Sequence, residues 1–341
     1  MSAMVNPFDQ GGFNLADMTR AIQLIPNRYG LLNALGLFPM EPISTRTAMV
    51  EMSEGELRLL PQKRLGAPAT MGNSDKRTIR SFSVPFIPHN DVVLPSDVMG
   101  IRGLGLKDGE DPVATVMARK LLRMRQRHGQ TLEYMRVKAL SGITKDGEGN
   151  TIYDWYKEFD ITKKSVDFTL GNEKTDVLEK SREITRHIED NLKGESMTSI
   201  MALVSPTFFD KLIKHPTVKE AYKYYQSTNA ANPLRDDMRN GFPFGGILYR
   251  EYMGTVTLAN GRTDKLITDG EGIAFPLGTL DTFSTLVAPG DLMECVGTYG
   301  EELYAYQVAR DDGTGIDIYT QSNPLPIVKR PALCVRLYSS S

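Results

Sequence analysis

Apolar residues recur on one helical face between residues 111 and 141. Successive members of this face are three or four residues apart, as on an amphipathic helix: Val113, Met117, Leu121, Met124, His128, Leu132, Met135 and Ala139. Asp111-Pro112 supplies an acceptor cap followed by proline at the first helical position, and Ser141-Gly142 ends the pattern. We therefore predict a helix over 112–141, about 45 Å long at roughly 1.5 Å per residue. His128 lies on its apolar face and is expected to be a core-edge residue, not a metal ligand.

The chain after residue 142 predicts further helices and many short strands. Ranges 151–159 and 161–170 alternate apolar and polar residues and predict a β-ribbon. A second amphipathic helix is expected over 173–192, and Ser205-Pro206 begins a third after a buried strand. The expected strands are 199–204, 246–256, 266–275, 292–296, 303–308, 316–320 and 332–338. Asn260-Gly261 is a tight-turn dipeptide, and the strand-rich second half places the chain in the α+β class.

The first ninety residues have a different pattern. Residues 1–43 are interrupted by glycine and proline, so we expect an irregular arm lying on another surface. Residues 45–60 and 78–86 favour strands and flank a proline- and glycine-rich middle, which predicts a long hairpin. A two-stranded ribbon with so little apolar surface is marginal alone. It is expected either to pack on a neighbouring subunit or to be an ordinary excursion on its own domain.

Charge is distributed unevenly although the whole chain is nearly neutral. There are 40 basic and 42 acidic residues among 341, a net charge of −2. The 111–141 segment alone carries seven basic and two acidic residues, a local charge of +5, which leaves −7 for the rest. This helix either faces a polyanion or an acidic partner, or is a solvated face with ion pairs between subunits.

Motifs for catalysis and cofactor binding are absent from the sequence. It contains neither a P-loop nor a nucleophile elbow, and the glycines at 100, 103, 105 and 109 lack dinucleotide-binding spacing and indicate a flexible joint. The four histidines are scattered, and two cysteines cannot build a disulfide framework or a four-cysteine zinc site. We expect no catalytic, cofactor or metal site. No secretory signal or membrane-spanning run is found, so we expect a soluble chain in a reducing compartment with no membrane partner.

The order of arm, basic hairpin, long helix, ribbon and α/β middle resembles the Hong Kong 97 fold of tailed-phage major capsid proteins. The C-terminal half resembles the lambda-type capsid protein E family more narrowly. The residues that carry this resemblance are Val204-Ser205-Pro206, Phe208–Lys211, Val218–Ala221, Gly246–Tyr252, Asn260-Gly261, Gly272-Ile273-Ala274, Leu277-Gly278-Thr279 and the run from Thr320 to Pro326. These features span most of residues 90–341, while residues 1–90 agree in layout more than in motif.

The resemblance implies an architecture and a function. Residues 1–43 would be an N-terminal arm, 44–90 an extended loop, 91–197 plus 311–341 a peripheral domain with spine helix 112–141, and 198–310 an axial domain. The chain would self-assemble into pentamers and hexamers that form the icosahedral head of a double-stranded DNA phage. It would be made in the host cytoplasm and reside in the virion. Expected partners are copies of itself, a separate scaffolding protein, a portal, a decoration or cement protein, and packaged DNA contacted without sequence readout.

Particular residues receive expected roles from the same resemblance. The interior or DNA-facing candidates are Arg119, Lys120, Arg123, Arg125 and Arg127. The candidates for intersubunit contacts in the loop are Lys63, Arg64, Lys76 and Arg77. The hinge candidates are Gly100, Gly103, Gly105 and Gly142. Two alternatives remain: an encapsulating shell of the same fold around cellular cargo, and a soluble enzyme with an unfamiliar α+β fold.

Overall fold

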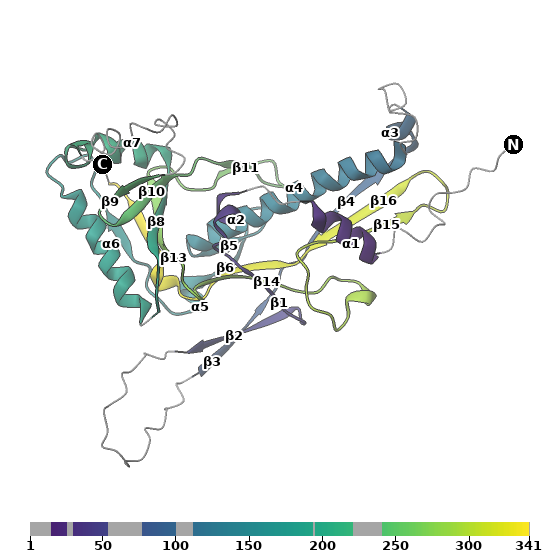
Figure 1. Cartoon of the computed structure of the whole chain (residues 1–341), viewed down its shortest axis with the longest axis horizontal. Helices are drawn as coiled ribbons and strands as arrows, with labels where there is room; N and C mark the ends of the chain where they lie inside the picture. Colours follow the sequence, from purple (N-terminus) through teal and green to yellow (C-terminus); the bar gives the residue numbers. More distant parts are fainter. Residues whose placement is uncertain are drawn as a thin grey trace, which may run out of the picture. The chain divides into compact units, whose positions relative to one another are not determined.

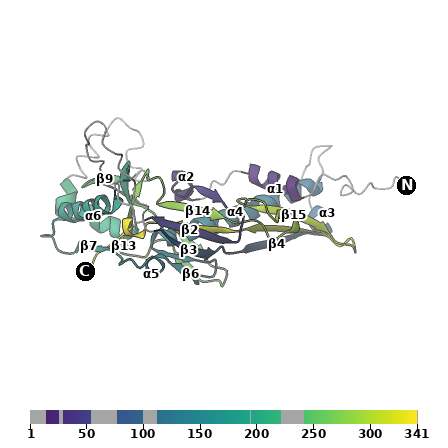
Figure 2. The same ribbon diagram turned by 90° about the horizontal axis from the view of Figure 1, so that it is seen from below.

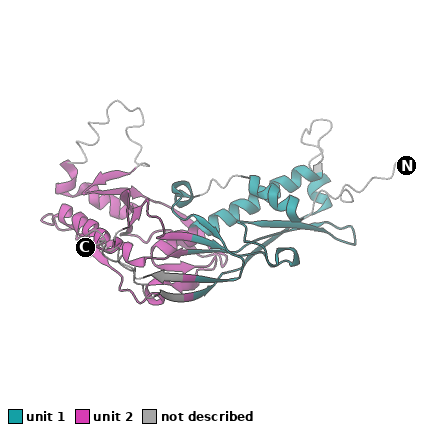
Figure 3. Ribbon diagram, turned by 60° about the horizontal axis from the view of Figure 1, so that its bottom comes forward, with its two compact units in different colours: residues 1–49, 81–133, 285–326 teal, residues 50–80, 134–284, 327–341 magenta. Residues whose placement is uncertain are grey.

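A computed structural model describes residues 15–25, 30–53, 77–99, 112–193, 195–220 and 241–340. The chain divides into two compact units (Figure 3). Unit 1 comprises residues 1–49, 81–133 and 285–326, and unit 2 comprises residues 50–80, 134–284 and 327–341. Each unit is thus assembled from three separate stretches of the sequence. The peripheral and axial boundaries expected from the resemblance stay a prediction.

Unit 2 is built on a six-stranded mixed sheet. The strand order is β7 (Ser165–Asp167), β18 (Val335–Tyr338), β13 (Glu271–Leu277), β8 (Ser199–Val204), β10 (Ile247–Glu251) and β9 (Phe242–Phe244). β8 pairs parallel to β10 and antiparallel to β13, so it is central and its last five residues are buried. This confirms the buried strand predicted at 199–204.

Two helices pack beside this sheet (Figures 1 and 2). α6 (Val177–Leu192) begins where the Asp176 carboxylate accepts the N–H groups of Leu178 and Glu179. α7 (Pro206–Lys214) begins at Ser205, whose hydroxyl accepts the Phe208 N–H at 3.3 Å. Both predicted helices are confirmed, and their apolar faces join a core centred on the buried rings of Phe168, Phe208 and Tyr249.

The predicted ribbon at 151–170 is wrong in detail. β5 (Ile143–Lys145) pairs with β6 (Thr151–Asp154), and Asp154 then caps the short helix α5 (Trp155–Glu158) because its side chain accepts the Lys157 N–H. β7, expected to be the other ribbon strand, pairs with β18 instead. The tight turn at Asn260-Gly261 is confirmed between β11 (Thr255–Thr257) and β12 (Thr263–Lys265).

Unit 1 contains a three-stranded antiparallel sheet covered by helices. Its strand order is β15 (Tyr304–Ala309), β16 (Ile316–Ser322) and β4 (Ile87–Val93). The predicted long helix is confirmed as α4 (Pro112–Leu140), of which residues 112–133 belong to this unit. Val116, Met117, Leu121 and Met124 from α4 form one core with strand residues such as Ile318.

In the described part of the predicted N-terminal arm, residues 15–25 and 30–43, we expected irregular structure but find two helices and a strand. α1 (Leu15–Leu24) buries Met18 and Ile22 in the unit 1 core, which stabilises a helix despite the surrounding glycines. α2 (Leu31–Leu35) and β1 (Met40–Pro42) follow, and β1 pairs parallel to β14 (Phe283–Val287), the neighbour of β17 (Pro324–Val328).

The remaining elements are short. β2 (Thr47–Ser53) and β3 (Arg77–Ser83) form a two-stranded sheet, which confirms the base of the predicted hairpin. α3 (Pro95–Met99) follows β4, and a 3₁₀ turn, η4 (Pro331–Leu333), precedes β18. The strand expected at 292–296 is wrong: Met293–Cys295 is the 3₁₀ turn η3, whose Cys295 is buried while Met293 is exposed.

Candidate functional site

The exposed side of α4 in unit 1 carries a row of arginines. The exposed positions between residues 118 and 127 are Ala118, Arg119, Leu122, Arg123, Gln126 and Arg127. Arg119, Arg123 and Arg127 recur at every fourth position, so they lie on one side of the helix about 6 Å apart along its axis. We call these three residues the arginine row.

The arginine row keeps its positive charge. Within the described part of the chain, Arg119 and Arg123 have no carboxylate within ion-pair distance. Arg127 donates from Nη1 to His89 Nε2 at 2.9 Å. Burial and the nearby Arg127 guanidinium lower the pKa of His89, so His89 is neutral at pH 7 and accepts this bond without neutralising the arginine. Among the residues that the structure describes, the row is therefore three cations without a carboxylate partner on a solvent-facing helix surface.

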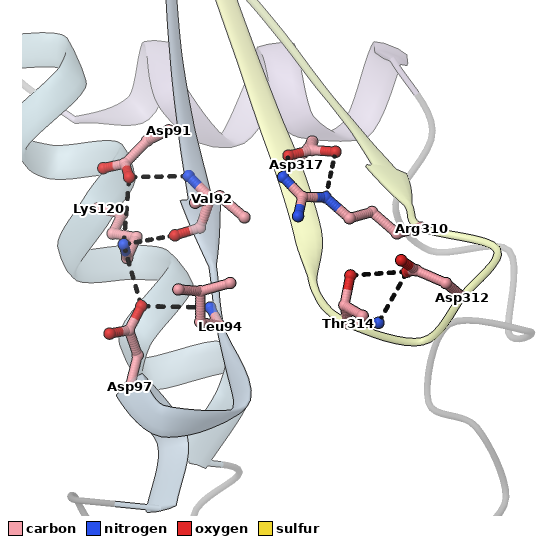
Figure 4. Close-up of polar contacts among 9 residues, drawn as sticks. All are labelled: Asp91, Val92, Leu94, Asp97, Lys120, Arg310, Asp312, Thr314 and Asp317. Atoms are coloured by element: carbon pink, nitrogen blue, oxygen red, sulfur yellow. Dashed lines mark hydrogen bonds and ion pairs between the residues drawn. The ribbon is translucent and has the colours of Figure 1, made fainter.

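Lys120 lies beside the row but is held inside unit 1 (Figure 4). Its ammonium is 3.2 Å from both the Asp91 and the Asp97 carboxylates and donates to the Val92 carbonyl at 2.6 Å. The Leu94 N–H and then Lys120 lower the pKa of Asp97, which keeps that carboxylate charged. Two carboxylates thus offset one ammonium, so Lys120 adds no positive charge to the surface.

Arg125 faces the interior of the unit. It is only 5% exposed, and its Nη2 is 2.7 Å from Glu302 Oε2. The neighbouring His128 is buried as predicted, with its ring nitrogens 2.8 Å from Ser322 Oγ and 3.0 Å from Thr320 Oγ1. Burial, followed by the nearby His89 and Arg125, lowers the pKa of His128 to about 3. This imidazole is therefore a neutral packing group.

The remaining basic residues of α4 lie in unit 2 and are also buried. Arg136 is 2% exposed, and Lys138 is 3.0 Å from Asp264 Oδ2. The Tyr134 hydroxyl donates to the same Asp264 oxygen at 2.8 Å. Of the seven basic residues in the segment, only the arginine row is left facing solvent, because four are buried or ion-paired within their own unit.

The sequence could not separate these two groups of cations. Helical spacing identifies which arginines share a face, but the partners of Lys120 and Arg125 are distant in the chain. Asp91 is 29 residues and Glu302 is 177 residues away. No local motif connects such pairs, so the pairing of Lys120 with Asp91 and of Arg125 with Glu302 required the structure.

The other candidates are only partly described. Lys63, Arg64, Lys76, Gly100, Gly103 and Gly105 lie outside the described residues. Arg77 is the first residue of β3. Gly142 follows α4 with φ +94°, and a Cβ there would lie 2.0 Å from the Tyr156 ring. This close approach fixes the position to glycine, whether or not it is a hinge.

The described residues hold no cluster of three or more histidine, cysteine or acidic side chains arranged to bind a metal ion. Among the same residues, no helix combines the length and the hydropathy needed to cross a membrane.

Comparison with known proteins gives concordant results. The family model for phage major capsid protein E matches residues 14–339. The major capsid protein of Pseudomonas phage KPP10 is 34% identical, covering 97% of this chain and 98% of its own. The major capsid protein of Salmonella phage Felix O1 is 30% identical, with the same two coverages.

Solved structures agree on the fold. A protein assigned as the capsid protein of an E. coli CFT073 prophage superposes with a TM-score of 0.60 at 14% identity, over 96% of this chain and 99% of its own. The mature capsid of bacteriophage PhiM1 gives 0.50 at 14% identity, over 92% of this chain and 88% of that one. The predicted Hong Kong 97-like α+β fold is confirmed.

Proposed function

This chain belongs to the phage major capsid protein E family and forms the capsid shell of a phage, and we propose that its arginine row contacts the packaged DNA inside that shell. Membership is carried by a family match over nearly the whole length and by two phage relatives at 30% identity or above. Since both relatives are phage major capsid proteins, an encapsulating shell for cellular cargo is not favoured.

The observation that supports the DNA contact is the difference between the basic side chains of α4 that pair with carboxylates of their own unit and those that face solvent. Lys120, Arg125 and Lys138 each have a carboxylate of the same unit within 3.2 Å. Among the described residues, Arg119, Arg123 and Arg127 have no such carboxylate, and they point to solvent. A row of guanidinium groups suits phosphate contacts that carry no sequence information, which is the readout a shell needs for any genome.

The proposal extends to the assembly around this contact. Copies of the chain would associate as pentamers and hexamers with the exposed side of α4 facing inward. A scaffolding protein, a portal and a decoration or cement protein would join them as separate chains, with assembly in the host cytoplasm. None of the described residues is assigned a catalytic role.

The salt dependence of DNA binding tests the role of the arginine row. We expect the triple variant Arg119→Gln, Arg123→Gln, Arg127→Gln to lower the slope of log K against log salt by roughly 2.7, at about 0.9 for each phosphate that is no longer neutralised. The matched control replaces three exposed lysines of unit 2, Lys211, Lys214 and Lys219, with glutamine and removes the same charge. Binding of a short duplex by unassembled subunits is measured for both.

Two results would contradict the DNA contact. If the triple-lysine control lowered the slope of log K against log salt as much as the triple-arginine variant does, net charge alone would govern DNA binding. Unchanged DNA binding with a failure to assemble would mean that the row pairs with carboxylates of a neighbouring subunit, the alternative left open by the charge pattern.

A further inference from the structure

The sheet of unit 1 has two edges at which another chain could add a strand. Among the residues that the structure describes, each outer strand of the order β15–β16–β4 pairs with β16 on one side only. The backbone N–H and C=O groups on the other side of an edge strand form a template for pairing with a foreign strand. Subunits of a shell are crowded together during assembly, so open edges on every copy would promote association by the wrong surfaces.

Side chains occupy the edge of β4. The Val92 N–H donates to Asp91 Oδ1 at 2.8 Å, and the Val92 carbonyl accepts from Lys120 Nζ at 2.6 Å. Lys120 is fixed in place by Asp91 and Asp97, each 3.2 Å away (Figure 4). Both backbone groups that Val92 would offer to a new strand are therefore already bonded.

The sequence of β4 removes another donor on the same side. Backbone groups of alternate residues point to the same edge of a strand, so Pro88 and Asn90 share the edge with Val92. Proline has no N–H to offer, and it is tolerated on edge strands for that reason. The backbone N–H of Asn90 is then the donor that remains on this side of β4.

Helix α1 occupies the edge of β15 in a corresponding way. The buried Thr19 hydroxyl accepts the Ala305 N–H at 3.1 Å and donates to the Ala305 carbonyl at 3.3 Å. Gln23 Nε2 donates to the carbonyl of Leu303, just before the strand, also at 3.3 Å. One helix of the same unit thus takes the bonds that a foreign strand would make at Ala305.

We infer that Lys120 with Asp91 at Val92 of β4, and Thr19 at Ala305 of β15, block these positions on the two edges of the unit 1 sheet against strand addition by a second copy of the chain. The inference goes beyond shell formation and does not depend on the arginine row. The competing explanation is that Lys120 and its carboxylates only stabilise the fold. Partly exposed ion pairs contribute little stability, so that explanation predicts a small loss of stability and no new association.

The test compares aggregation of unassembled subunits when an edge is opened. The edge variants are Lys120→Met with Asp91→Ala, and Thr19→Val, which keeps the size of the buried side chain. The matched control is Arg310→Gln with Asp317→Asn, because that bidentate pair of the β15–β16 hairpin has lengths of 2.9 and 2.8 Å and contacts no edge backbone. The measurements are the pelleted fraction that is not shell, its thioflavin fluorescence and the denaturant midpoint of the soluble subunit.

We expect each edge variant to give a several-fold larger thioflavin-positive pellet than the control. Lys120→Arg retains a donor for the Val92 carbonyl and should behave like the parent chain. Asn90→Pro added to the Lys120→Met, Asp91→Ala variant removes the remaining donor and should reduce the pellet again. Pellets equal to the control, or a pellet that Asn90→Pro does not reduce, would overturn the inference, because proline at the edge cannot restore stability lost with the ion pair.

Discussion

At the scale of single side chains, the buried ionisable groups of α4 differ in the polar groups that surround them. Arg125 and His128 are both buried, but Arg125 has the Glu302 carboxylate 2.7 Å away, whereas the hydrogen-bond partners of His128 are two hydroxyl groups and its imidazole stays neutral. The cost of burying an uncompensated charge accounts for the difference. The sequence correctly placed His128 at the core but contained no sign of either set of partners.

The neutral state of His128 predicts how stability depends on pH. Its folded pKa of about 3 is below the ordinary value of 6.5, so between these values the unfolded chain binds more protons and the folded state loses stability as pH falls. The contribution is up to about 1.4 kcal/mol per pH unit. We expect the drop in unfolding free energy from pH 6.5 to 5 to be smaller in His128→Gln. Equal drops in the two proteins would contradict a neutral, buried His128.

Gly142 predicts a second effect of a single residue. Because its φ is positive and the Tyr156 ring lies 2.0 Å from where a Cβ would sit, Gly142→Ala strains the backbone and displaces the ring. We expect a loss of about 1–3 kcal/mol in unfolding free energy, in the usual range for such strain. Gly147→Ala is the control, since a Cβ there has nothing within 4 Å. Similar denaturant midpoints for both variants would contradict the packing at Gly142.

Individual helices and strands differ in how clearly their local sequence predicts them. α4 and α6 have long apolar periodicity, so both helices were predicted, although α6 begins at Val177 and not at Glu173 as expected. α1 is preceded by glycines and buries only Met18, Thr19 and Ile22, and its stability depends on β15, which is almost 300 residues away. β17 contains Pro324 and Pro326, which argue against a strand by local rules, yet all five of its residues are buried. Contacts between residues that are remote in sequence stabilise α1 and β17, so the local sequence pattern could not predict these two elements.

The cap of α6 gives a prediction for one element. Asp176 accepts the N–H groups of Leu178 at 2.9 Å and Glu179 at 3.1 Å, bonds that no other group replaces when the side chain is shortened. Asp176→Ala should therefore lower the unfolding free energy by about 1 kcal/mol, the usual cost of losing a helix cap. Asp176→Asn retains an acceptor and should lose much less. Equal losses in a denaturant titration would mean that the carboxylate acts through its charge and not as a cap.

For the molecule as a whole, the order of elements was more informative than any one motif. The arm, hairpin, long helix and returning strands identified a capsid fold from weakly specific pieces, and the family match over residues 14–339 confirms it. What the sequence could not supply was the division of seven α4 cations into an exposed row and internal pairs. That division is a property of the packed unit, and it restricts the proposed DNA contact to Arg119, Arg123 and Arg127.

Assembly is the most direct test of the central claim that this chain is a shell subunit. The full chain, produced alone and with the proposed scaffolding protein, is separated by size and imaged by negative-stain electron microscopy. Closed shells, or rings of capsomers, are the predicted result. A 38.0 kDa monomer that forms neither under any assembly condition would contradict the claim.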